Sequence, residues 1–395
     1  MLTDSSIQDR LTEVKNRLAN KASYYDRERA FPFENFEAIR QTGLHVVNLP
    51  EVDGGQNFNV EQTCELLTQL SSGCGATALC LAMHLYSVGG FQHILHPKLL
   101  AEVNKKVREG HYIASISNPN VYFLYKNEDF ERVSSLKATK VAGGYIVNGT
   151  KPYVSGAPIV YYIPLYCYTL ASQGQRAGIT AMLANRDMEG ITVKDTWNIS
   201  GMVATMTHQL DFDNVFIPDS NLIGSPGRGL EATHELIYWF RLALCAVYQG
   251  IARSAYDYVL DMVKKKVDVI SQKKMCFLPN VQYAIADMKV LLDNSQTILL
   301  AAARQVDRDI ATGTLGDVSY LTTLEVKQTL SNSVNEIIAI AAKIQGTCSL
   351  QRGNLLERLY RDANALHYHP PREDLLKEYI AKKELGIIPL KNRWI

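Results

Sequence analysis

The chain has 395 residues, of which 47% are hydrophobic and 21% are charged, and its formal net charge is +1. This apolar fraction is enough for the core of a large folded protein with two or three domains. A charge near zero, without a block of lysine and arginine, argues against a partner that is a nucleic acid or a membrane. We therefore expect a cytoplasmic protein with a small-molecule substrate.

The N-terminus has no apolar signal segment, and no apolar run approaches the roughly 18 residues that a membrane span needs. The seven cysteines are scattered, odd in number and without a CxxC spacing. This pattern is typical of reduced cysteines in a cytosolic protein. We predict neither disulfides nor a metal site.

Residues 1–111 are predicted to form a helical N-terminal domain. A capped start at Thr3 and Asp4 precedes apolar residues that recur every three or four positions from Ile7 to Leu18. The later run ATALCLAMHLYSVGGF is apolar around its whole circumference. This second pattern indicates a buried helix.

Between residues 112 and 223 the pattern changes to short alternating runs separated by turn residues, such as YIVNGTKPYVSG and QLDFDNVFI. Gly143 and Gly144 stand between two of these runs and predict a hairpin. The economical interpretation is a compact antiparallel β domain.

Residues 224–395 return to helical periodicity. Long periodic segments cover residues 231–266, 281–312, 318–344 and 373–385. Four long helices with short connections predict a four-helix bundle. The fold class is therefore α+β, with a helical domain, an antiparallel β domain and a helical bundle in that order.

This order and four local strings resemble the acyl-CoA dehydrogenase superfamily. The most specific string is SGMVATMTHQLDFDNVFIPDSNLIGSPGRGL at 200–230, which is similar to the family segment G-M-(x)4-T-(x)2-L that leads into the first bundle helix. The others are LPEVDGGQNF at 49–58, YIVNGTKPYVSGA at 145–157 and LLERLYRDA at 355–363. The resemblance covers nearly the whole chain and implies the acyl-CoA dehydrogenase-like fold.

The resemblance also implies a flavin, normally FAD with FMN as the alternative, between the β domain and the bundle. Ser155 stands where the family donates a hydrogen bond to flavin N5, and Tyr153 replaces the tryptophan beside the ring. Ser117 stands where a family hydroxyl contacts the pyrimidine edge. The alternative interpretation is that both serines are ordinary turn residues.

The part of the family site that holds the adenosine pyrophosphate is less complete here. Phe277 and Gln282 resemble remnants of the family's Arg-x-x-Phe-Gly string and its downstream glutamine, but no arginine is present. Lys343, Gly346 and Thr347 take the place of the family's Gln-x-x-Gly-Gly-x-Gly string. These five residues are the candidates for binding the rest of the cofactor.

Oxidation of an acyl thioester requires a base that removes the α proton. The two positions where the family carries its glutamate base fall on Pro370 and Phe240, so neither has a carboxylate. The Pro370-Pro371 turn is expected to aim His369 and His367 at the flavin, where a histidine exchanges protons near neutral pH. The alternative is that both histidines only make hydrogen bonds at a helix end.

Three further residues are candidates for substrate binding: His84 on the buried helix, Tyr122 in an aromatic loop and Arg241 on the first bundle helix. Each has a structural alternative. His84 can be a satisfied core histidine, Tyr122 can pack against a neighbour, and Arg241 can serve the packing and ion pairs of the bundle.

Family membership favours a flavin oxidoreductase that oxidises the Cα–Cβ bond of an acyl thioester and passes electrons to an electron-transfer flavoprotein. A second hypothesis is a monooxygenase of the same fold, which uses O₂ and a flavin reductase and needs no α-proton base. A third is a non-catalytic flavin-binding protein. Long apolar helix faces and the shared flavin site of the family predict a homodimer or homotetramer.

Overall fold

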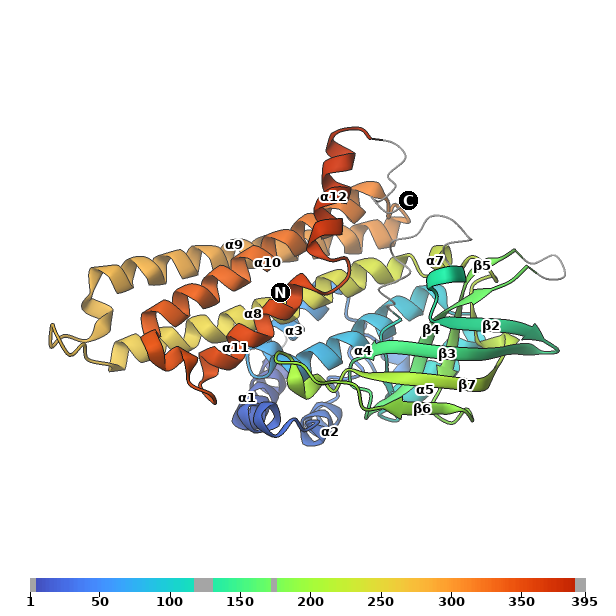
Figure 1. The fold of residues 1–395 in the computed structure, drawn as a ribbon, viewed down its shortest axis with the longest axis horizontal. Coiled ribbons are helices and arrows are strands. Elements are labelled where there is room, and N and C mark those ends of the chain that lie inside the picture. Colours follow the sequence, from blue (N-terminus) through green and yellow to red (C-terminus); the bar gives the residue numbers. More distant parts are fainter. Residues whose placement is uncertain (1–4, 117–130, 172–175, 388–395) are drawn as a thin grey trace.

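The computed structural model describes residues 5–116, 131–171 and 176–387. Figure 1 shows a twisted sheet at one end of the molecule and long helices that extend away from it. The helices of the N-terminal block lie beside both parts, so the three blocks pack as one unit. The α+β class predicted from the sequence is confirmed, whereas the predicted cap at Thr3 and Asp4 lies outside the described residues.

The N-terminal block consists of helices, and its first helix buries the predicted apolar stripe. Ile7 and Leu18 are among the buried residues of α1. A capping box of Asn59 and Gln62 satisfies backbone groups at the start of α3. The helices are α1 (Ser5–Glu28), α2 (Phe33–Gln41), α3 (Val60–Ser71), α4 (Gly75–Ile94) and α5 (Pro97–Arg108).

Helix α4 is the central helix of this block. Every residue from Gly75 to Phe91 is buried, as its continuous apolar pattern predicts. A Cβ atom added at Gly89 would lie 2.6 Å from the ring of Trp239. The absence of a side chain at Gly89 therefore lets α4 pack closely against the first long bundle helix.

The strands of the sheet lie between residues 112 and 223. Gly143 has a φ of 75° and joins two antiparallel strands in which Val141 pairs with Gly144, so the predicted hairpin is present. The strand order is β6-β7-β3-β2-β4-β5-β8, with β1 beside β4. The strands are β1 (Tyr112–Ile113), β2 (Leu136–Val141), β3 (Gly144–Val154), β4 (Val160–Thr169), β5 (Gly178–Asn185), β6 (Ile191–Lys194), β7 (His208–Pro218) and β8 (Leu222–Ile223).

The sheet is mixed, which corrects the expectation of a purely antiparallel domain. Strand β4 runs parallel to both β1 and β2, while the other described pairs are antiparallel. Strand β3 runs antiparallel to β2 and brings the chain back to the sheet end where β2 begins. Strand β4 then pairs with the other edge of β2 and runs parallel to it. Side chains alternate along β4, so Tyr166 enters the main helical core and Leu165 enters a separate core within the sheet.

The C-terminal block is built on long helices that pack side by side (Figure 1). Helix α11 contacts both α8 and α10 and occupies the fourth place in the bundle, whereas α12 packs mainly on α10. The sequence predicted residues 373–385 as the fourth long helix, but Pro370 and Pro371 redirect the chain before it. The helices are α7 (Gly229–Ala232), α8 (Glu235–Lys265), α9 (Pro279–Thr312), α10 (Asp317–Gln345), α11 (Leu355–Asn364) and α12 (Glu373–Glu384).

All seven cysteines are free, and five of them are buried. This agrees with the reduced cysteines predicted from their spacing. Within the described ranges, no helix combines the length and the hydropathy that crossing a bilayer requires.

Candidate active site

A cavity of about 720 Å³ lies where the sheet meets the helices. Its walls come from α4, α8, β3, the segment before β7, and the chain between α11 and α12, so all three sequence blocks contribute. A volume of this size is typical of ligand and cofactor sites. The lining residues are Leu79, Met83, Ser115, Tyr153, Ser155, Trp197, Ile199, Ser200, Gly201, Met202, Thr207, Phe240, Arg361, Asn364, Ala365, Tyr368, His369, Pro370, Arg372 and Leu375.

The wall next to the sheet carries three hydroxyl groups. Thr207 donates a hydrogen bond of 3.0 Å to Ser155 Oγ, which leaves the proton of Ser155 free to donate to a ligand. Ser115 is hydrogen-bonded to the buried Tyr86 hydroxyl at 2.8 Å. Tyr153 has a φ of 58°, in the left-handed region, and is largely exposed at the mouth. Serine and threonine hydroxyl groups beside an exposed aromatic side chain can bind the edge of a planar ring that carries polar atoms.

The part of the wall that the helices form is largely apolar. Leu79 and Met83 stand four residues apart on α4 and therefore share one face of that helix. Phe240 of α8 and Leu375 of α12 continue the surface, and all four side chains are buried. This wall excludes water and favours an uncharged, hydrophobic ligand.

His369 closes the cavity from the turn between α11 and α12. Its Nε2 atom lies 2.8 Å from the hydroxyl oxygen of Tyr248, a fully buried residue of α8. The turn itself is held by Lys327 of α10, which donates a hydrogen bond of 2.8 Å to the carbonyl oxygen of Pro371. Two bundle helices therefore anchor this histidine.

Burial, together with the positive charge of Lys327, lowers the pKa of His369 to about 3. The imidazole is neutral at pH 7 and accepts a proton poorly. This corrects the expectation that the histidine titrates near neutral pH. The reason is physical: the charged form loses hydration in the cavity wall and meets a neighbouring cation there.

Both positions where the resemblance placed a base line the cavity. Phe240 and Pro370 occupy them, and neither carries an ionisable group. Among the described lining residues there is no aspartate or glutamate. The described part of the cavity thus has polar donors and a neutral histidine, but no carboxylate that would remove a proton from a substrate.

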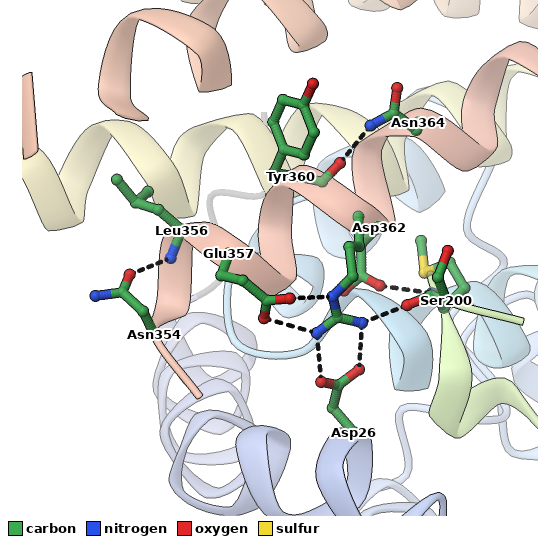
Figure 2. Close-up of polar contacts among 10 residues, drawn as sticks. Asp26, Ser200, Asn354, Leu356, Glu357, Tyr360, Asp362 and Asn364 are labelled. Carbon is green, nitrogen blue, oxygen red and sulfur yellow. Dashed lines mark hydrogen bonds and ion pairs between the residues drawn. The ribbon is translucent and has the colours of Figure 1, made fainter. Parts of the chain in front are cut away.

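Arg361 also lines the cavity, but its guanidinium is engaged with protein groups. It donates to both oxygens of Asp26 at 3.1 and 2.6 Å and to both oxygens of Glu357 at 2.6 and 2.9 Å, and a further bond goes to the carbonyl of Ser200. Figure 2 shows Asp26, Glu357 and Ser200 converging on one side chain of α11. The hydrogen bonds that Arg361 donates to Glu357 outweigh the effect of burial and raise the pKa of Arg361. Arg361 joins α1 and the loop that contains Ser200 to α11, so its cation is not free to bind a ligand.

Three family models match the chain in the order of its blocks. They are the N-terminal domain of acyl-CoA dehydrogenase at residues 5–96, the middle domain at 126–215 and the C-terminal domain at 242–371. The chain belongs to the acyl-CoA dehydrogenase family. The resemblance drawn from the four strings is confirmed.

The relatives and structural neighbours of this chain carry names of different activities. The putative acyl-CoA dehydrogenase YdbM of Bacillus subtilis (strain 168) is 24% identical over 381 residues, covering 94% of this chain and 95% of the relative. The dibenzothiophene monooxygenase TdsC of Paenibacillus sp. A11-2, solved with FMN and indole, has a TM-score of 0.88 at 19% identity and covers 99% of this chain and 100% of that one. KijD3, solved with FMN and a dTDP-linked amino-keto sugar, has a TM-score of 0.85 at 22% identity, covering 99% and 96%. The structural likenesses establish the fold.

His84 of this acyl-CoA dehydrogenase family chain lies away from the cavity. Its Nε2 atom is 2.8 Å from the carbonyl oxygen of His45, and its Nδ1 atom accepts a hydrogen bond from the Ile113 amide. Burial lowers the pKa of His84 to about 3. Its neighbour Met83 reaches the cavity instead, because adjacent helical residues point about 100° apart. His84 is a satisfied core histidine in this structure.

His367 is also outside the cavity lining. Its Nδ1 atom lies 2.8 Å from a carboxylate oxygen of Glu373, and its Nε2 atom lies 2.9 Å from the amide nitrogen of Asn335. The ring joins the start of α12 to α10. Of the two predicted catalytic histidines, the structure brings only His369 to the cavity.

Arg241 points into the bundle and not into the cavity. Its side chain is buried, donates a hydrogen bond of 3.1 Å to Thr323 and lies 4.2 Å from the ring centre of Tyr320. The preceding residue, Phe240, is the one that faces the cavity. These contacts correspond to the packing alternative for Arg241.

The predicted adenosine-site residues lie at the far end of the bundle. Gln345 donates to the hydroxyl of Tyr258 at 2.8 Å, and Tyr258 lies roughly 27 Å farther along α8 than Phe240. Lys343, Gly346 and Thr347 flank Gln345. Phe277 lies just before α9 and Gln282 lies in the first turn of α9, near the same end of the bundle. One chain does not bring these residues to its own cavity.

Two predicted site residues, Ser117 and Tyr122, lie outside the described residues. Among the cavity residues that sequence reasoning did not select, Thr207 had a usable signal, because it is the threonine of the quoted G-M-(x)4-T-(x)2-L segment. Ser115 stands two residues before Ser117 in the sequence. Trp197 had no local signal, since a long loop carries it to the cavity.

Proposed function

We propose that this chain is a flavin-dependent monooxygenase of the acyl-CoA dehydrogenase family that acts on a small hydrophobic molecule in the cytoplasm. The observation that carries the proposal is the cavity lining, which in the described residues contains no carboxylate even at the two positions of the family base. Thioester oxidation requires such a base. His369 is a poor substitute, because its pKa lies near 3.

The cavity fits a flavin ring by its size and by its donors. Ser115, Ser155 and Thr207 would hold the polar edge of the ring, and Tyr153 with Trp197 would lie beside it. TdsC and KijD3 were both solved with FMN. When bound and reduced, a flavin supplies the electrons that activate O₂, so no α proton has to be removed.

FMN is the cofactor that one chain would hold by itself. The residues suggested for the adenosine pyrophosphate lie near the end of α8 that carries Tyr258, roughly 27 Å along the helix from Phe240 in the cavity wall. Every donor of Arg361 is already bonded to a protein group. FAD would therefore need a second copy of the chain to supply those residues. Mass spectrometry of the flavin released by heat distinguishes these two possibilities. Light scattering measures whether the chain forms a homo-oligomer.

The chain's own residues then have separate tasks. Leu79, Met83 and Phe240 exclude water and hold an apolar substrate. His369, neutral and fixed by Tyr248, offers a ring N–H or lone pair at the cavity surface. The net reaction places one atom of O₂ on the substrate and releases the other as water, with two electrons and two protons that a flavin reductase supplies.

The decisive experiment compares two reactions of the flavin-loaded protein. Rapid O₂ consumption with a flavin reductase and NADH, together with no bleaching by a panel of acyl-CoAs under anaerobic conditions, supports the monooxygenase. Bleaching by an acyl-CoA refutes it. A colourless protein that binds neither FMN nor FAD leaves only a non-catalytic or flavin-free role.

Oxidation of an acyl thioester is the second candidate function. It is favoured by sequence relatives such as YdbM, whose name is that of a putative acyl-CoA dehydrogenase. In that case the electron acceptor would be an electron-transfer flavoprotein. The acyl-CoA panel tests this candidate directly.

A further inference from the structure

A lysine is buried in the bundle interior next to the turn that carries His369. Lys327 of α10 is 1% exposed, and its ammonium donates a hydrogen bond of 2.8 Å to the carbonyl oxygen of Pro371. A charged amine buried in a protein is unfavourable unless strong acceptors surround it. The contact places this cation at the last residue of the Pro370-Pro371 turn.

A second contact reaches the same histidine from another helix. Tyr248 of α8 is fully buried, and its hydroxyl oxygen lies 2.8 Å from Nε2 of His369. Their rings meet edge to face, with centres 5.7 Å apart. No described residue is hydrogen-bonded to Nδ1 of His369. The imidazole is therefore held by one nitrogen while its other nitrogen has no partner within the described chain.

We propose that Lys327 and Tyr248 are positioning residues that hold His369 at the cavity in a single orientation, uncharged, with its proton on Nδ1. Tyr248 donates its hydroxyl proton to Nε2, which leaves Nδ1 as the ring N–H donor. Lys327 fixes the backbone that carries the ring. This inference rests on the proposed function for the role of His369, but its geometry is tested separately.

The charges around the ring are consistent with a neutral imidazole. Burial lowers the pKa of Lys327 to about 8, so its amine is still mostly protonated at pH 7. The cation disfavours a second positive charge on His369. Burial holds the Tyr248 pKa far above its ordinary value, so its hydroxyl keeps its proton. Other ionisable groups that act on this cluster are Arg241 and Cys245 of α8, Asp362 of α11 and Glu373 of α12.

The first test reads the histidine itself. Protein labelled with ¹⁵N-histidine is examined by long-range ¹⁵N–¹H correlation, and the His369 signals are assigned by their loss in His369→Gln. We expect the parent to show the Nδ1–H tautomer. Tyr248→Phe is expected to shift the ring to the Nε2–H tautomer, and Lys327→Met is expected to raise the pH at which the ring titrates. Lys289→Met removes an exposed lysine of α9 as the matched control and leaves both signals unchanged.

The second test measures turnover of the flavin-loaded protein. Each positioning variant is expected to lose roughly tenfold or more in kcat with flavin affinity unchanged, because small displacements of reacting groups reduce rates up to about 10²-fold. Circular dichroism confirms folding, and if Lys327→Met fails to fold, Tyr248→Phe carries the test. An Nε2–H tautomer in the parent, or His369 signals that neither variant alters, would overturn the proposal that Lys327 and Tyr248 position His369. If the His369 signals change as expected but no oxygenase activity is found, only the proposed function is refuted.

Discussion

Ser155 and His369 line the same cavity, although Ser155 directly follows strand β3 and His369 follows helix α11. A planar ring between them would meet a hydroxyl on one side and a neutral imidazole on the other. Their meeting results from the packing of α8 against both α4 and α11, which brings the end of the bundle over the end of β3.

Replacing His369 with alanine is expected to lower turnover by more than about tenfold while flavin remains bound, because the ring faces the cavity but does not fill it. Steady-state kinetics and the flavin spectrum measure both quantities. His367→Ala is the matched control and is expected to retain turnover, because His367 contacts Glu373 and Asn335 outside the cavity lining. Unchanged kinetics in His369→Ala would make that residue structural.

Replacing Arg361 with methionine is expected to lower the free energy of unfolding by about 2 to 4 kcal/mol, because Asp26 and Glu357 lose their shared cation in a largely buried site. Arg361→Lys restores only part of this loss, since an ammonium lacks the planar fork that serves two carboxylates. Urea denaturation measures the change. The control Arg253→Met removes an exposed ion pair with Asp257 and is expected to lower the free energy of unfolding by less than about 0.5 kcal/mol. An equally small decrease in Arg361→Met would contradict a stabilising role for the contacts of Arg361 with Asp26 and Glu357.

Asp362 predicts a pH dependence of stability. Burial, partly offset by Arg358, raises its pKa from 3.8 to about 6, and it accepts a hydrogen bond of 2.5 Å from the Met202 amide. The folded state therefore binds a proton more tightly than the unfolded state, and this group destabilises the fold as the pH rises from about 4 to about 6. Relative to Asp362→Asn, the parent is expected to gain up to about 3 kcal/mol when the pH falls from 7 to 4. Denaturation of both proteins at several pH values measures this difference in the free energy of unfolding. If that free energy depends on pH in the same way in the parent and in Asp362→Asn, the prediction is refuted.

Gly201→Ala is expected to destabilise the protein by about 1 to 3 kcal/mol and to weaken flavin binding. An added Cβ would lie 2.3 Å from the carbonyl oxygen of Arg361, so the cavity wall and α11 must separate. Thermal unfolding and a flavin titration measure the two effects. Gly316→Ala serves as the control, because its added Cβ meets nothing closer than 3.7 Å. Equal melting temperatures for the two variants contradict this prediction.

Local patterns were sufficient for the elements and for the order of the three blocks. The continuous apolar run from Gly75 to Phe91 predicted a buried helix, and Gly143-Gly144 predicted a hairpin, because both depend only on neighbouring residues. The family strings also indicated Ser155 and the His369 turn. The direction of β4 was not predictable in this way, because it depends on which edge of β2 the strand joins.

By itself the sequence determined the fold class, the family, and the absence of a carboxylate at two named positions, since these follow from residue identity and spacing. Only the tertiary structure decided that Met83 and Phe240 face the cavity while their neighbours His84 and Arg241 do not. Adjacent helical residues point about 100° apart, so one can face a ligand while the next is buried in the core. It also decided the charge of His369. A histidine's pKa depends on the burial and the cations around it, and Lys327 and Tyr248 reach it from distant parts of the chain.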